Sequence, residues 1–519
     1  MSFDIILIYQ IPKCILLELL TGIDNTYCKG ERIMMKKRLC VLLCITIIMG
    51  AMSGCGKKGG NDSAKTNQNE VADSTETTTE DEKEENGKPE QVIVKYGLGP
   101  LEEDTEVILD DYNKSVEKFK ELHPNVQVDN ARYDYNVDTF VPLAESGNLP
   151  TVFGTWFSEP QKLIANGYVA DITDILAERG WLDTMNKSIR GILSDKDGRI
   201  YGIPAFGYAL GLMQNVEMFK AAGLVDKNGA PLIPATWQEV ADFAKKIKDA
   251  TGKSGICILA QDNGAGWHFS NIAWGFGATL TVDNGDGTYT AAVNSKEAIE
   301  AMEYVKSLKW EYDVLTEDPL SENGGTGFAQ LASGNAAMFI GASDGLPQLI
   351  NNGAKLGEFA ICGLPAGPKG QYSLFGGTPY MFSSNATEAE INAALDFLAL
   401  RGFGPEVNEE AIAARVKTIV DSGFPVVPDF AIWDSRELAV AQNKIIKQNC
   451  NMDPTLYENY FATTMIEGNL HLEEVGATQD LYAELTKVIQ AVITDQNADV
   501  ASLMETANNN YQTILDNLK

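Results

Sequence analysis

The stretch Gly147-Asn148-Leu149-Pro150-Thr151-Val152-Phe153-Gly154 places a turn signal directly before a short run of β-branched and aromatic residues. Such a run, bounded by glycine, predicts a strand over residues 149–154. A loop at residues 155–159 and a helix that ends at Gly167 are expected to follow. A short strand leading into a helix is the repeating unit of α/β proteins, so this stretch favours that fold class.

The same alternation continues on both sides of this stretch. Strands are predicted at residues 91–96, 126–128 and 210–215, and helices at residues 111–123 and 237–250. Thr236 is expected to cap the second helix. This alternation favours a parallel or mixed sheet with helices on both faces. Ligands of such sheets bind beyond the carboxyl ends of strands, so the loops there are the places to seek a site.

A secretory signal precedes the predicted fold. The basic cluster Lys36-Lys37-Arg38 is followed by an apolar run at residues 39–49 and then by Met52-Ser53-Gly54-Cys55. This order is typical of a signal peptide, and the run is too short to span a membrane. The cysteine after small residues resembles a bacterial lipobox. We therefore expect a lipoprotein signal peptide at residues 34–54 and lipid on Cys55, which would hold the protein at the extracellular face of the cell membrane. The alternative is a plain signal peptide with an incidental cysteine.

The segments on either side of this signal carry different expectations. Residues 1–33 form a weaker apolar segment interrupted by acidic residues, and signal peptides do not begin so far upstream of their basic region. We expect residues 1–33 to be a non-native extension, with the start at Met34 or Met35; an extra N-terminal helix is the alternative. Residues 55–90 are rich in Asn, Ser, Thr, Lys and Glu, and are expected to form a disordered acidic tether.

Size, charge and cysteine usage narrow the class of protein. About 430 residues remain after the tether, more than one hydrophobic core usually supports, so two lobes are expected. The formal net charge of −31 argues against nucleic acid as a partner and against a basic membrane-binding surface. Cys257, Cys362 and Cys450 are too scattered for a disulfide framework or a zinc site. We expect buried free thiols, no metal site and no cofactor.

Six motifs occur in a fixed order between about residue 92 and the C-terminus. They are Gly147-Asn148-Leu149-Pro150-Thr151-Val152-Phe153, Leu163-Ile164-Ala165-Asn166-Gly167-Tyr168-Val169-Ala170-Asp171-Ile172-Thr173, Tyr201-Gly202-Ile203-Pro204, Thr236-Trp237-Gln238-Glu239-Val240, Gly334-Asn335-Ala336-Ala337-Met338-Phe339-Ile340-Gly341, and Gly376-Gly377 before Asn385-Ala386-Thr387-Glu388-Ala389. With these motifs the chain resembles the extracellular solute-binding proteins of ABC importers, particularly the sugar-binding group that includes maltose-binding protein.

The resemblance implies an α/β, type II periplasmic-binding-protein-like fold, in which two hinged lobes enclose a central ligand cleft. Chain crossings are expected near Ile203-Pro204 and at residues 372–376. It also implies a monomeric receptor that delivers a sugar or similar polar solute to permease subunits in the membrane. A receptor that feeds a signalling partner is an alternative that these motifs do not separate. The lobes are expected at residues 91–203 plus 373–435 and at residues 204–372 plus 436–519.

The resemblance also indicates candidate ligand residues. Sugars present hydroxyl groups and flat apolar faces, so their receptors need aromatic rings with carboxylates or amides. The loop at residues 155–159 matches the family's first ligand loop and supplies both, with Trp156 expected to stack and Glu159 to bind hydroxyl groups. Tyr208 follows the first crossing, where the family places a ligand residue. For Trp156 and Tyr208 the alternative is core packing.

Four more candidates come from the second half of the chain. Residues 255–260 are expected to form a strand, and the two glycines that follow predict a flexible loop presenting Trp267 and His268, in a place similar to an aromatic cluster of maltose-binding protein. A structural role is the alternative for His268. Asp344 falls where maltose-binding protein stacks a Trp, which favours a ligand with more polar or cationic groups. Tyr482 loosely matches another aromatic ligand region.

One motif indicates an enzyme instead. Gly341-Ala342-Ser343-Asp344-Gly345 fits the G-x-S-x-G nucleophile elbow and follows a strand-like run. A surface serine hydrolase using Ser343 would need a downstream His, for which His471 is the candidate, but no His-Gly-Gly run precedes the motif. A binding protein without catalytic residues is therefore favoured over the hydrolase. Residues 283–287 fail the spacing of a calcium loop and predict a hairpin turn.

Overall fold

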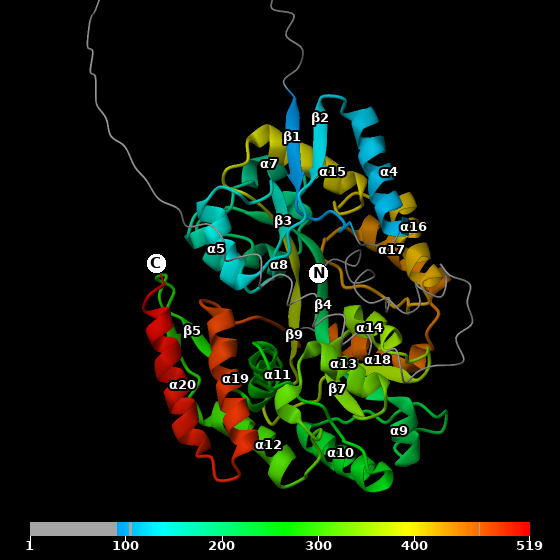
Figure 1. The fold of residues 1–519 in the computed structure, drawn as a ribbon, viewed down its shortest axis with the longest axis vertical. Coiled ribbons are helices and arrows are strands. Elements are labelled where there is room, and N and C mark those ends of the chain that lie inside the picture. The colour runs from blue at the N-terminus through cyan, green and yellow to red at the C-terminus, as the bar shows by residue number, and fades with distance from the viewer. Residues whose placement is uncertain (1–90, 103–105, 467, 519) are drawn as a thin grey trace, which may run out of the picture. The chain divides into compact units, whose positions relative to one another are not determined.

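The computed structural model describes residues 91–102, 106–466 and 468–518, which all belong to one compact unit of the chain. The predicted extension, signal peptide, tether and Cys55 lie outside the described residues. Figure 1 shows the strands near the middle with helices around them.

The described strands are β1 (Val92–Tyr96), β2 (Val126–Asn130), β3 (Val152–Gly154), β4 (Gly202–Asn215), β5 (Thr281–Asp283), β6 (Tyr289–Ala291), β7 (Met338–Ala342), β8 (Phe359–Gly363), β9 (Ser373–Phe382) and β10 (Leu470–Leu472). The first helices are α4 (Glu106–Leu122), α5 (Val137–Glu145), α6 (Pro160–Ala165), α7 (Thr173–Glu178), α8 (Lys187–Ile192), α9 (Val216–Ala221), α10 (Trp237–Thr251), α11 (Gly264–Phe276) and α12 (Lys296–Trp310). The later helices are α13 (Gly324–Ala332), α14 (Leu346–Asn351), α15 (Glu388–Leu400), α16 (Glu409–Asp421), α17 (Arg436–Asn449), α18 (Glu458–Thr464), α19 (Thr478–Thr494) and α20 (Val500–Leu515). Short 3-10 turns are η1 (Leu182–Thr184), η2 (Pro319–Ser321), η3 (Ser343–Gly345) and η4 (Pro454–Leu456).

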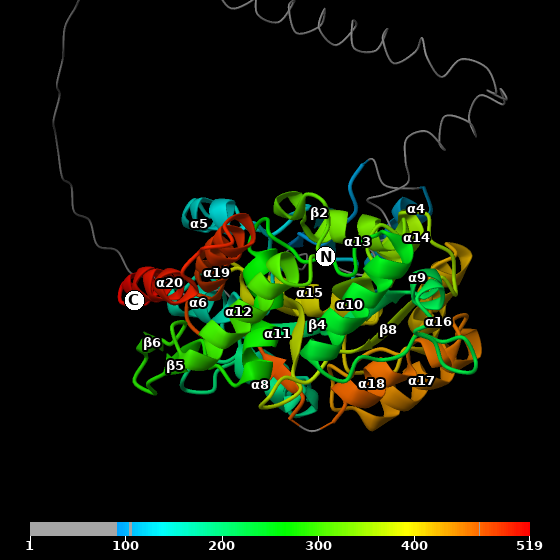
Figure 2. The same cartoon turned by 90° about the horizontal axis from the view of Figure 1, so that it is seen from below.

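Strand β4 connects two groups of strands. Its first part pairs with β9, from Gly202 opposite Met381 to Ala209 opposite Phe375. Its second part, from Leu210 onward, pairs with β7 and β8. On the other side β9 continues the order through β3 and β1 to β2, and β10 adds to β9 in parallel. Figure 1 shows β4 and β9 running together between the upper and the lower elements. Figure 2, seen from below, shows helices α10, α11 and α12 on that lower side.

The first βαβ unit shows why these residues form a parallel pair. Helix α4 connects β1 to β2, and Val92 lies opposite Val126 while Tyr96 lies opposite Asn130. The Val94 and Tyr96 side chains are fully buried beneath the helices. A helical crossover is the ordinary connection between parallel strands, so the predicted alternation is confirmed here. The boundaries of the two lobes are not tested by this topology and stay a prediction.

Several local predictions can be compared with the structure. Thr236 accepts a hydrogen bond from the Glu239 backbone N–H and caps α10 as expected. The hairpin turn at residues 283–287 is also confirmed, since it joins β5 to β6. Helix α4 begins five residues before its predicted start. The strand expected at residues 255–260 is wrong, because only isolated bridges form there, at Ser254 and Cys257.

The three cysteines of the described residues are free thiols, as expected. Cys257 and Cys362 are buried, but Cys450 is partly exposed, which corrects the expectation that all three are buried. The Cys450 Sγ lies 3.0 Å from the Tyr457 hydroxyl, and that position at the end of α17 leaves one side of the thiol open. Because burial raises the pKa of Cys257 and Cys362, these two thiols are held in the neutral form.

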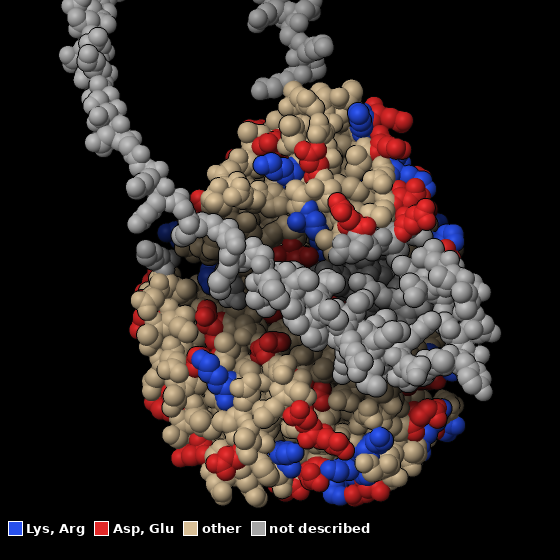
Figure 3. Space-filling model, viewed as in Figure 1, with Lys and Arg blue, Asp and Glu red and all other residues tan. Residues whose placement is uncertain are grey.

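The described part of the chain has no helix that is both long and apolar enough to cross a membrane. On the face shown in Figure 3, Lys and Arg side chains are interspersed with Asp and Glu instead of forming one basic area. A nucleic-acid interface needs a concentrated positive patch, so this face does not supply one.

Candidate functional site

The candidate site begins at the loop that follows β3. The Thr155 N–H donates to the Pro379 carbonyl at 3.2 Å, and the Phe157 N–H donates to the Gly377 carbonyl at 3.2 Å. These two bonds hold the loop against β9. Trp156 lies between the two anchors and is 39% exposed. An indole held on a fixed loop and left partly open to solvent is available for stacking, which the core alternative for Trp156 does not explain.

Glu159 follows on the same loop, at the start of α6, and is 2% exposed. The Tyr135 hydroxyl donates to Glu159 Oε2 at 2.5 Å, and the Ser158 hydroxyl donates to Oε1 at 3.2 Å. Burial raises the pKa of Glu159 although these hydrogen bonds lower it. The Tyr135 ring also meets Trp156 edge-to-face, with centroids 5.2 Å apart. Tyr135 thus positions both predicted residues of the loop, and the sequence carried no signal for it.

Glu473 is a second carboxyl group at this place, and it was not among the predicted residues. Strand β10 pairs with β9, so Glu473 comes directly after the pair Leu472 and Phe375. Burial, and to a smaller extent the nearby Glu159 carboxylate, raise the pKa of Glu473 to about 8. Trp267, Ser158 and Tyr482 lie close enough to lower it.

The polar atoms around Glu473 are incompletely paired. Glu473 Oε2 and the hydroxyl oxygens of Tyr482 and Thr155 are buried, and none has a hydrogen bond of ordinary geometry within the described residues. Unpaired buried polar atoms are uncommon because each loses the hydrogen bonds that it made with water. Tyr482 lies next to Glu473, so these two unpaired atoms indicate where a polar ligand would complete the hydrogen bonding.

Two adjacent glycines explain how aromatic rings reach this place. A Cβ atom at Gly376 would lie 2.6 Å from the Tyr208 hydroxyl oxygen, and one at Gly377 would lie 2.7 Å from Cε2 of Phe157. Each ring has space over β9 only because the glycine next to it lacks a side chain. The Tyr208 ring then meets Trp267 edge-to-face at 6.3 Å. The Gly376-Gly377 motif is therefore a packing requirement of the site.

The predicted flexible loop around Trp267 and His268 is wrong, because residues 264–276 form helix α11. A Cβ atom at Gly266 would lie 2.3 Å from the Tyr482 carbonyl oxygen, so this glycine permits close approach of α11 to α19. Trp267 is partly buried beside Tyr208, whereas His268 is 6% exposed and its ring lies 5.6 Å from Phe339. Burial lowers the pKa of His268 to about 3, so it is neutral. The geometry places His268 with the core.

Gln479 links this helix to the β3 loop. Its Nε2 donates to the Ser158 hydroxyl at 3.0 Å, and its Oε1 accepts from Asn263 Nδ2 at 2.9 Å. Tyr482 lies on α19 one turn further along and is 1% exposed. The start of α19 therefore joins the β3 loop and α11 at the carboxyl groups of Glu159 and Glu473.

Asp344 lies in η3, directly after β7, and lines a separate pocket with an empty volume of about 990 Å³ that includes open solvent. Trp156 and Trp267 are not among the residues that line it. Burial raises the pKa of Asp344 to about 6. Burial also raises the pKa of Tyr208, and both Glu473 and Asp344 raise it further, so Tyr208 lies within electrostatic reach of both places.

The contacts of Ser343 do not form a hydrolase triad. The Tyr460 hydroxyl is 3.5 Å from Ser343 Oγ. His471 instead stacks on Trp274 with ring centroids 3.8 Å apart, and its Nδ1 lies against the Leu472 carbonyl. Trp274 is 2% exposed, so this stacked pair belongs to the core. Among the described contacts, no Ser343–His471 interaction supports a nucleophile and its base.

The structure therefore brings together five of the seven predicted ligand residues and adds several more. Trp156, Glu159, Tyr208, Trp267 and Tyr482 gather around Glu473, and Asp344 lies in the neighbouring pocket. Glu473 was recognisable as a polar residue directly after a strand. The other additions, Tyr135, Ser158 and Gln479, depend on tertiary contacts. The ligand-binding role of these residues stays a prediction.

Comparison with known proteins shows which family model and which relatives the chain matches. Residues 105–400 match the family model described as bacterial extracellular solute-binding protein. A binding protein of Brucella abortus (strain 2308) is 27% identical over 262 residues, which cover 45% of this chain and 59% of the relative. The sn-glycerol-3-phosphate-binding periplasmic protein UgpB of Escherichia coli (strain K12) is 27% identical over 165 residues, which cover 30% of this chain and 35% of the relative. The chain thus spans less than two thirds of the length of these relatives.

Solved structures are similar over most of the described residues. The ABC substrate-binding protein Lmo0181 from Listeria monocytogenes, in complex with cycloalternan, has a TM-score of 0.62 at 14% identity, with 82% of this chain and 100% of that chain covered. UgpB from Mycobacterium tuberculosis, in complex with glycerophosphocholine, has a TM-score of 0.61 at 15% identity, with 78% of this chain and 94% of that chain covered. These likenesses confirm the predicted two-lobed α/β fold of type II.

Proposed function

The chain belongs to the bacterial extracellular solute-binding protein family, and on that premise we propose that it binds a carbohydrate beside Glu159 and Glu473 and delivers it to an ABC permease. The aromatic rings of Trp156, Trp267 and Tyr208 would cover the apolar faces of the sugar. The carboxyl groups would accept hydrogen bonds from its hydroxyl groups.

The observation that carries this proposal is the set of buried acceptors beside aromatic rings. Glu159 is 2% exposed, and Glu473 Oε2 is buried without a hydrogen bond within the described residues. A hydroxyl group that donates to Oε2 would remove the cost of leaving it unpaired, about 1–3 kcal/mol. A saccharide offers such donors in several directions, together with C–H faces for the rings.

A phosphorylated solute is the second candidate, because the relatives named UgpB bind sn-glycerol 3-phosphate or glycerophosphocholine according to their descriptions. The charges near the candidate site oppose this ligand class. A phosphate group beside Glu159 would meet a buried carboxyl group that already accepts two hydrogen bonds, and Asp480 adds negative charge near it. Arg415, in the neighbouring pocket, is already paired with Asp429 at 3.8 Å. Neutral hydroxyl groups fit this arrangement better.

Anchoring and delivery rest on the sequence and the family. Cys55 and the acidic tether would hold the receptor at the extracellular face of the membrane, within reach of the permease. A signalling partner in place of a permease remains the alternative for delivery. A surface hydrolase using Ser343 is disfavoured, because the described contacts of His471 are with Trp274 and Leu472.

Calorimetric titration of the purified protein would test the ligand class. The neutral arm contains D-tagatose, maltotriose and cycloalternan, and the phosphorylated arm contains sn-glycerol 3-phosphate and glycerophosphocholine. We expect at least one neutral saccharide to bind, and Glu159→Gln and Glu473→Gln each to weaken it by about tenfold or more. Glu410→Gln is the matched control, because that side chain is 87% exposed. Binding confined to the phosphorylated arm would contradict the carbohydrate proposal.

A further inference from the structure

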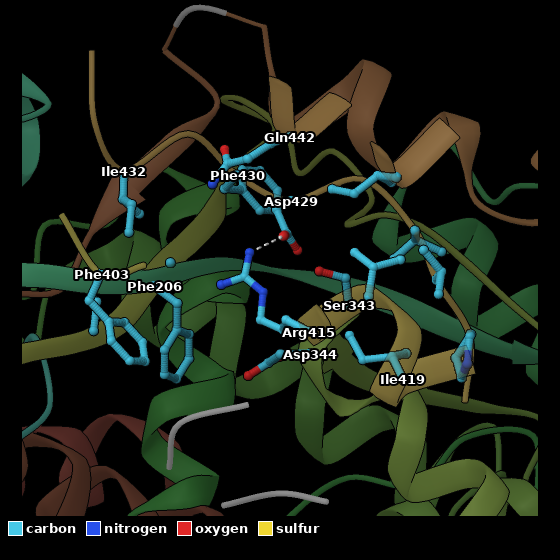
Figure 4. A pocket seen from close by; sticks show the side chains of 17 residues that line it. Phe206, Ser343, Asp344, Phe403, Arg415, Ile419, Asp429, Phe430, Ile432 and Gln442 are labelled. Atoms are coloured by element: carbon cyan, nitrogen blue, oxygen red, sulfur yellow. Dashed lines mark ion pairs between the residues drawn. The ribbon is translucent and has the colours of Figure 1, made fainter. Parts of the chain in front are cut away.

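The pocket beside β4 is lined by other residues than those that surround Glu473. Its walls include the rings of Phe206, Phe403 and Phe430 and several branched aliphatic side chains. Its polar groups are Ser343, Asp344, Arg415, Asp429 and Gln442. Figure 4 shows Phe206 and Phe403 next to each other at one side of the pocket and the guanidinium of Arg415 near its middle. The pocket is thus mainly apolar and aromatic, with a small charged group at its centre.

The charges of this pocket do not balance. Arg415 NH2 lies 3.8 Å from Asp429 Oδ2, and this ion pair is drawn as a dashed line in Figure 4. Asp344 also lines the pocket, and among the described residues no Lys, Arg or His forms an ion pair with it. One carboxylate of the pocket therefore has no ion-pair partner among the described residues. A partly buried carboxylate beside aromatic rings is an environment that favours a cation, because ring faces also attract positive charge.

The pocket is close to the candidate sugar site. Phe206 lines the pocket, and Tyr208, two residues further along β4, meets Trp267 of the sugar site at 6.3 Å. Residues two apart on a strand lie on the same face of the sheet. On β9, the ring centroid of Phe375 lies 6.1 Å from that of Phe157 in the β3 loop and 6.1 Å from that of Phe430 in the pocket. The two places are therefore neighbours along β4 and β9.

We propose that this pocket receives a protonated amine carried by the bound saccharide, with Asp344 as its counter-ion and the phenylalanine rings as its walls. The inference rests on the proposed function, since it narrows the solute from a carbohydrate to an amino sugar or an oligosaccharide that contains one. Arg415 would stay paired with Asp429 and would not oppose the incoming charge. A sugar carboxylate or phosphate in the same position would face Asp344 without a free cation.

Matched pairs of sugars test the proposal directly. Cellobiose and its 2-amino-2-deoxy disaccharide differ by one hydroxyl group replaced by an ammonium group, and glucose with glucosamine and galactose with galactosamine provide further pairs. Titration at pH 7 of wild type, Asp344→Asn and Asp183→Asn compares the same sugars on three proteins. Asp183 is the matched control, because its side chain is 97% exposed.

We expect at least one aminated sugar to bind the wild type about tenfold or more tightly than its neutral partner. Asp344→Asn should remove this preference, while Asp183→Asn should keep both the preference and the wild-type affinity for the neutral sugar. Equal binding within every pair, or a preference that survives Asp344→Asn, would overturn the amine pocket while the carbohydrate receptor stands. Failure of every saccharide to bind the wild type would overturn the proposed function itself. Asn matches Asp in size, and thermal unfolding of each variant checks that it is folded.

Discussion

The Gln479 side chain donates a hydrogen bond from its Nε2 to the Ser158 hydroxyl at 3.0 Å, across a sequence separation of 321 residues. The loop after β3 and the start of α19 are therefore in direct contact. The same glutamine accepts from Asn263 at the start of α11. Three segments that are distant in sequence meet at one amide group, beside the carboxyl groups of Glu159 and Glu473.

Removing this amide should affect ligand binding more than folding. In Gln479→Ala, the loss of two partly buried hydrogen bonds should lower the free energy of unfolding by about 1–2 kcal/mol. The β3 loop would lose its contact with α19, so the affinity for the solute should fall because Trp156 and Glu159 are less well positioned. Titration and urea unfolding measure the two effects. Gln238→Ala on α10 is the matched control, since Gln238 is exposed and lies away from these groups; equal effects of the two changes on affinity would contradict a positioning role.

Trp156 and Trp274 offer a comparison of one residue type in two environments. Trp156 is 39% exposed and Trp274 is 2% exposed. Trp156→Ala should weaken ligand binding by about 1–3 kcal/mol and change stability little, because an exposed ring has few core contacts to lose. Trp274→Ala should lower stability by about 3–5 kcal/mol, because it leaves a cavity and removes the donor to Glu474 Oε1, while Oε2 keeps its bond from Thr281. Titration with urea unfolding of both variants distinguishes these outcomes, and a large loss of stability in Trp156→Ala would support core packing instead.

The residues of the candidate site differ in whether a local sequence pattern could predict them. Trp156 and Glu159 belong to one short loop after a strand, so a local pattern was sufficient to predict them. Glu473 reaches the same place only because β10 pairs with β9, and that pairing joins residues about 100 positions apart. No local pattern indicates which strand a three-residue segment will join.

The error at α11 has a different cause. Two glycines close together usually signal a loop, and this preference led to the wrong expectation for residues 262–271. In the structure Gly266 lies in helix α11, and the residue must be a glycine there because a Cβ atom would clash with the Tyr482 backbone. The need for close approach between two helices outweighed the low helix propensity of glycine, and that need is visible only once α11 and α19 are placed.

Gly376 offers a test of the packing that brings Tyr208 into the site. Gly376→Ala would place a methyl group 2.6 Å from the Tyr208 ring, so the ring must move away from Trp267 and Glu473. We expect stability to fall by about 1–3 kcal/mol and ligand affinity to fall as well. Gly191→Ala in α8 is the matched control, because nothing lies within 4 Å of the added methyl group. Its stability should be unchanged or rise by about 0.5–1 kcal/mol; tolerance of Gly376→Ala in both measurements would show that the ring position is unimportant.

The lipid anchor can be tested in cells. In Cys55→Ser no thiol is present to take a lipid, so the protein should appear in the medium or remain with its signal peptide uncleaved. Cell fractionation and mass measurement of the N-terminus follow both outcomes, with Cys450→Ser as a thiol control that should stay on the membrane. Cleaved Cys55→Ser protein retained on the membrane would show that another feature anchors it.

The Glu473 carboxyl group should make stability depend on pH. Its pKa is raised by burial to about 8 in the folded state, against about 4.3 in an unfolded chain. Between these values the folded protein holds a proton that the unfolded chain has released, so the free energy of unfolding falls as pH rises from about 5 to 8 and then levels off. Glu473→Gln removes this contribution, and the stability difference between variant and wild type should grow in the variant's favour over that range, by at most about 1.4 kcal/mol per pH unit.

The pKa values of Glu159 and Asp344 are also raised, so their contributions to stability change with pH in the same direction, and only the difference between the two proteins isolates Glu473. Urea unfolding without ligand at pH 5, 6, 7 and 8 measures it, with Glu410→Gln as control. A difference that stays constant across these pH values would mean that Glu473 is ionised in the folded protein and solvated as an ordinary carboxylate.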